Sequence, residues 1–146
     1  MTPGEFADEL PGRLHGPHDD ANTIGSARLA GELIRFLNYA TRPHAGGLTE
    51  PAAIYLLTGE LAAAMCRLPQ LFSQLADWLT EEMSNGRLED DAGRPVDRLT
   101  DDACAALNQA MSRAHDLGRD LMDAQVLTAG LRRPDDGDER RGTAHA

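Results

Sequence analysis

Histidine and carboxylate side chains come closest together near the N-terminus of this 146-residue chain, in the pattern H-x-x-H-D-D. The members are His15, His18, Asp19 and Asp20. Imidazole and carboxylate groups bind zinc, but structural zinc sites usually take four ligands from ordered elements. This group lies in a segment rich in Gly and Pro, so the sequence predicts a polar arm there and no metal centre. Whether His15 and His18 bind a metal ion is left open.

A second acidic group, Glu89, Asp90, Asp91 and Asp97, surrounds Gly93 and invites comparison with a calcium loop. An EF-hand needs acids at alternate positions, Gly at the sixth position and Glu at the twelfth. Here the acids are adjacent instead. The pattern therefore indicates a solvated turn.

The remaining titratable side chains do not form a catalytic constellation. Glu81 and Glu82 are adjacent on an expected helix, where they point about 100° apart and make poor acid and base partners. His115 is expected on an exposed helix surface. His44 and Arg42 lie near a helix start that could hold an anion, but no second convergent cation is present. We predict no catalytic residue, no cofactor and no metal, and a protein that is not an enzyme.

Charge and composition exclude further functions. The chain contains no Lys, which excludes Schiff-base catalysis and a phosphate-loop lysine. The formal net charge is -10, of which about -4 falls in residues 1–20 and about -6 in residues 77–102. Phosphate backbones would be repelled, so direct nucleic-acid binding is not expected. The acidic surface either keeps the protein soluble or meets a basic partner.

Location is predicted by elimination. Residues 1–16 have no basic start and no apolar run, so they do not resemble a secretory signal. No segment approaches 18 consecutive apolar residues, as a membrane span would. The two cysteines, Cys66 and Cys104, are far apart and in apolar helical contexts, so we expect buried free thiols. These features predict a cytoplasmic protein without a membrane partner.

One apolar stripe dominates the middle of the chain. Its members, spaced alternately three and four residues apart, are Ile54, Leu57, Leu61, Ala64, Leu68, Leu71, Leu75 and Trp78. This spacing keeps one face of a helix aimed at a neighbouring helix. Aromatic residues are only 4 % of the chain and Val and Ile are scarce, which indicates a core of Leu and Ala between helices and no sheet.

Start and stop signals divide the chain into helices. The first secure helix is expected from an N-cap at Asn22 or Thr23 to about Ala40. The second should begin at 49–51, be interrupted or kinked at Pro69, and end before 85–86. The last should begin with a cap at Thr100 and continue to 132–133. We predict an all-α, up-down bundle of three to four helices whose middle rod is kinked at Pro69. The bundle domain covers residues 21–133, between a disordered acidic arm at 1–20, with a short helix around 5–10, and a disordered tail at 134–146.

Two segments carry a family resemblance, residues 36–44 (FLNYATRPH) and residues 67–79 (RLPQLFSQLADWL). Both resemble segments of a group of small, uncharacterised actinobacterial helical proteins, over about residues 30–130. This resemblance implies an all-α domain and an actinobacterial origin, but no activity and no catalytic residues. By shape the chain also looks like the helical hairpins exported by type VII secretion. Those proteins carry W-x-G in the hairpin turn, whereas Trp78 is followed by Leu79 and Thr80, so export by that route is not expected.

These observations predict a non-enzymatic helical module for protein–protein interaction, acting on a protein partner or on itself, with a homodimer as one form. The alternative is an acidic regulator or DNA mimic that occupies a basic nucleic-acid-binding partner. The candidate partner-binding residues are Trp78, Asp90 and Asp91. For Trp78 the favoured interpretation is a plug that seals the end of the core, and an anchor in a partner's pocket is the functional alternative.

Overall fold

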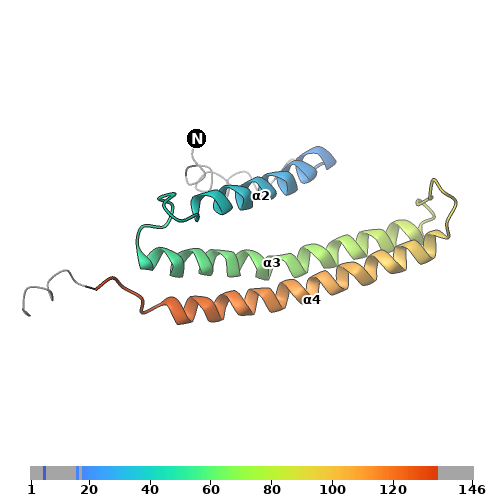
Figure 1. Ribbon diagram of the computed structural model, residues 1–146. Helices are drawn as coiled ribbons and strands as arrows, with labels where there is room; N and C mark the ends of the chain where they lie inside the picture. The colour runs from blue at the N-terminus through green and yellow to red at the C-terminus, as the bar shows by residue number, and fades with distance from the viewer. Residues whose placement is uncertain (1–4, 6–15, 17, 135–146) are drawn as a thin grey trace, which may run out of the picture. The chain divides into compact units, whose positions relative to one another are not determined.

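The computed structural model describes residues 5, 16 and 18–134, and all regular secondary structure within them is helical. The helices are α2 (Asp20–Ala40), α3 (Pro51–Ser84) and α4 (Val96–Thr128) (Figure 1). The chain divides into two compact units, residues 1–49 with α2 and residues 50–146 with α3 and α4. The all-α class is therefore confirmed. The arm expected at 1–20 and the tail expected at 134–146 lie almost entirely outside the described residues.

Helix α2 begins three or four residues earlier than the sequence signals indicated. Asp19 is the N-cap, and its carboxylate accepts a hydrogen bond of 2.7 Å from the backbone N–H of Asn22. Asn22, expected as the cap, instead lies in the first turn and donates its amide to the same carboxylate at 2.8 Å. A carboxylate is the stronger acceptor for the free N–H groups of a first turn. The helix ends at Ala40, as predicted, and Arg42 covers the ring of Tyr39 at 4.3 Å.

Helix α3 is one continuous helix of 34 residues. Glu50 is the N-cap, Pro51 occupies the first turn, and Asn85 is the C-cap, followed by Gly86 with a φ of 65°. These punctuation residues confirm the predicted start and stop. Pro69 lies inside the helix, so the helix is not interrupted there, and the kink expected at this residue stays a prediction. A proline removes one backbone hydrogen bond, and the packing of α4 along α3 supports the helix through this position.

Both ends of helix α4 lie earlier in the chain than predicted. It begins at Val96 after Pro95, four residues before the expected cap at Thr100, and it ends at Thr128. Thr100 is 5 % exposed, so it lies in the helix interior and not at its start. Pro95 explains the start, because proline has no backbone N–H, and the N–H groups at the beginning of a helix have no partner within the helix. Gly130 explains the early end, because glycine is a poor helix former.

Helices α3 and α4 lie side by side and antiparallel, joined by residues 85–95 (Figure 1). The most buried residues of this hairpin are small: Ala62, Ala76, Thr100, Ala114 and Gly118. We call them the small-residue seam. A Cβ atom built on Gly118 would lie 3.1 Å from the sulfur of Cys66, which shows how closely the two backbones approach. Small side chains allow this approach, and the hairpin is held along its length by Ala and Gly contacts.

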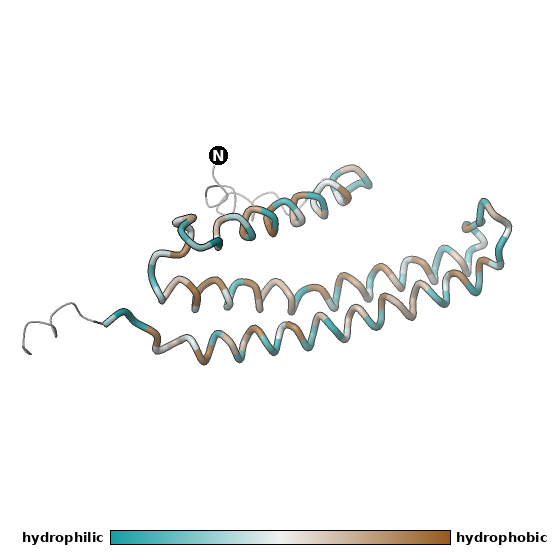
Figure 2. Tube along the Cα trace, in the orientation of Figure 1, coloured by the Kyte–Doolittle hydropathy of each residue, from teal (hydrophilic) through white to brown (hydrophobic). Residues whose placement is uncertain are grey.

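The apolar stripe predicted from the sequence does not form this seam. Leu71, Leu75 and Trp78 are 46 %, 45 % and 56 % exposed, whereas Ala62 is 3 % exposed. The seam positions follow stripe positions by one residue, which is about 100° around a helix. Apolar residues cover much of α3 (Figure 2), so two neighbouring rows of residues along the helix, the leucine row and the alanine row, both recur at seven-residue spacing. The close packing of Ala and Gly decides between them. None of the described helices combines the length and hydropathy needed to cross a membrane.

Candidate functional site

The histidine and acid group near the N-terminus does not assemble into a metal site in the part of the chain that the structure describes. His15 lies outside that part, His18 is exposed, and both carboxylate oxygens of Asp19 accept hydrogen bonds from Asn22. Asp19 therefore has a structural role as a helix cap. Over the described residues, no three His, Cys, Asp or Glu side chains are grouped so that they could hold a metal ion.

Asp90 organises the loop between α3 and α4. Its carboxylate accepts hydrogen bonds from the backbone N–H of Ala92 at 3.1 Å and of Arg94 at 3.0 Å. The guanidinium of Arg94 adds two more, at 3.1 and 2.8 Å. The Arg94 side chain, followed by its backbone N–H, lowers the pKa of Asp90 to about 2. The Asp90 side chain is only 12 % exposed, while Asp91 beside it is exposed.

A second ion pair closes the same loop. Arg87 donates two hydrogen bonds to the carboxylate of Glu82, at 2.9 and 2.6 Å. This geometry raises the pKa of the Arg87 guanidinium, chiefly through the hydrogen bond to Glu82. The carboxylates of Glu82 and Asp90 are therefore already paired with arginine side chains within the hairpin. Of the two acids named as candidate partner contacts, Asp91 is the one that faces solvent, and its role in binding stays a prediction.

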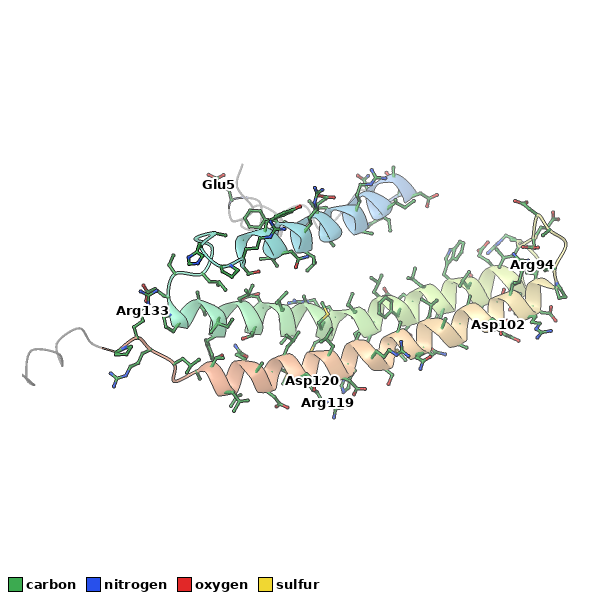
Figure 3. All side chains as sticks on the ribbon, viewed as in Figure 1. Glu5, Arg94, Asp102, Arg119, Asp120 and Arg133 are labelled. Atoms are coloured by element: carbon green, nitrogen blue, oxygen red, sulfur yellow. The ribbon has the colours of Figure 1, made fainter. Side chains whose placement is uncertain are left out.

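The other candidate groups are dispersed. His44 and His115 are exposed on different units of the chain. Cys66 is exposed, which corrects the expectation of a buried thiol, whereas Cys104 is half-buried with its sulfur 3.6 Å from the carbonyl oxygen of Ala76. A shallow depression on α4 is lined by Arg119, Asp120, Met122 and Asp123. All four come from one exposed helix surface, with Arg119 and Asp120 in the C-terminal half of α4 (Figure 3), so the depression does not enclose a ligand.

A further candidate is an apolar surface on α3. It consists of the half-buried Leu61 and Leu68 and the exposed Leu71, Leu75 and Trp78, which we call the α3 face. Trp78 does not plug the core, because more than half of it is exposed. Residues 51–80 contain only three charged side chains, Glu60, Arg67 and Asp77. A helix that is apolar on most of its circumference requires burial on more than one side, and α4 covers one side.

Exposed apolar residues also occur elsewhere. Val126 and Leu127, near the end of α4, are 72 % and 80 % exposed, and α2 exposes Ile24, Ile34 and Phe36. The α3 face differs from these because its members recur at seven-residue spacing along one side of a long helix. Such contiguous apolar patches are typical of protein–protein contact sites.

Sequence reasoning missed the small-residue seam and therefore placed the apolar stripe in the core. The signal was present, because Ala62 and Ala76 are two heptads apart on α3, as are Thr100 and Ala114 on α4. Comparison of the chain with protein-family models, with curated proteins and with solved structures found no match.

Proposed function

We propose that this protein is a non-enzymatic helical interaction module that binds another helical protein surface through the α3 face. The observation that carries the proposal is the exposure of Leu71, Leu75 and Trp78 beside one another on a helix with few charges. Burial of a large apolar side chain in a contact contributes about 1.5–3 kcal/mol, so leaving these three in water is costly. A partner helix over this face recovers that free energy.

The shape and composition of the face also support a helical partner. Its members recur at intervals of three, four or seven residues, which is the spacing that a second helix contacts. Trp78 provides an anchor near one end, since tryptophan is enriched among the residues that dominate binding energy. The face lies on one continuous helix, so binding does not require the hairpin to refold.

The proposal extends to the finer architecture and location. The α3 face completes an up-down bundle of three to four helices when its partner is bound, with a bend at Pro69 that adjusts the two halves of α3 to that partner. We place this assembly in the cytoplasm, without direct contact to nucleic acid or membrane.

Site-specific photo-crosslinking of the full chain in its native host tests the proposal. The photoreactive amino acid p-benzoylphenylalanine replaces Trp78 in one variant and Val126 in a matched control. Val126 is the more exposed of the two, 72 % against 56 %, but lies outside the α3 face. We expect a defined protein adduct at position 78 on irradiation and a much weaker one at 126. Equal labelling at both positions, or none at 78, would contradict the proposal.

A further inference from the structure

We draw no further inference here: the strongest candidate, the exposed apolar patch of Leu71, Leu75 and Trp78 on α3, belongs to the site already described, and nothing in the described part of the chain shows what covers it.

Discussion

Replacement of Gly118 by Ala tests the close approach of α3 and α4. A Cβ atom at this position would lie 3.1 Å from Cys66 Sγ and 3.7 Å from the Cβ of Met65. Ala is better than Gly in a helix interior by about 1 kcal/mol. The sulfur contact, a few tenths of an ångström too short, opposes this gain. In the wild-type background we expect the two effects nearly to cancel, with a change of less than about 0.5 kcal/mol in the free energy of unfolding.

Removal of the sulfur separates the two effects. In a Cys66→Ala background the new methyl group has room, so Gly118→Ala should raise the free energy of unfolding by about 1 kcal/mol. The double-mutant cycle then gives a coupling of about 0.5–1.5 kcal/mol between the two positions. Urea unfolding of the four chains at one protein concentration, followed by circular dichroism, measures it.

Two results would refute this reasoning. Destabilisation of more than about 1 kcal/mol in both backgrounds would mean that the backbones, and not the sulfur, exclude a methyl group. An equal gain in both backgrounds would mean that the helices do not approach closely at Gly118.

Three further predictions concern the loop, the α3 face and the proline. Because the pKa of Asp90 is lowered, its ionised carboxylate stabilises the fold at pH values above its ordinary pKa near 3.8, and this stabilisation is lost as the pH falls through about 2. Asp90→Asn should therefore lower the melting temperature at pH 6 but not at pH 2. Leu75→Ala should cost only about 1.3 kcal/mol in urea unfolding, since Leu75 is 45 % exposed in the single chain and a fully buried leucine would cost more. Pro69→Ala should stabilise by about 1–3 kcal/mol in the same assay, because it restores the N–H donor to the Met65 carbonyl inside a continuous helix; a neutral or negative change would contradict that.

The ends of the helices were predictable to the extent that local chemistry specifies them. Asn85 and Gly86 stop α3 because glycine adopts the left-handed conformation needed there, and this local requirement is visible in the sequence. The start of α4 was not predicted, because Thr100 followed by two acids has the pattern of a cap. Its burial against α3 instead places it within the helix, and that contact involves residues far away in the chain.

The candidate site was predicted only in part. Trp78 was identified as a possible anchor, but its exposure was not foreseen, because periodicity alone cannot say which of two adjoining apolar rows faces the neighbour. Asp90 and Asp91 look alike in sequence. The turn at Gly93 separates them, since it brings the N–H groups of Ala92 and Arg94 to one carboxylate and leaves the other in water.

The sequence by itself determined the class, the three long helices of the described region and the low charge of residues 51–80. All of these depend on composition, spacing and local backbone preference. Only the tertiary structure decided that the seam runs through Ala62, Ala76, Ala114 and Gly118, and that Leu71 and Leu75 remain exposed. The reason is steric. Two backbones approach most closely where side chains are smallest, and this choice depends on the shapes of both helices together.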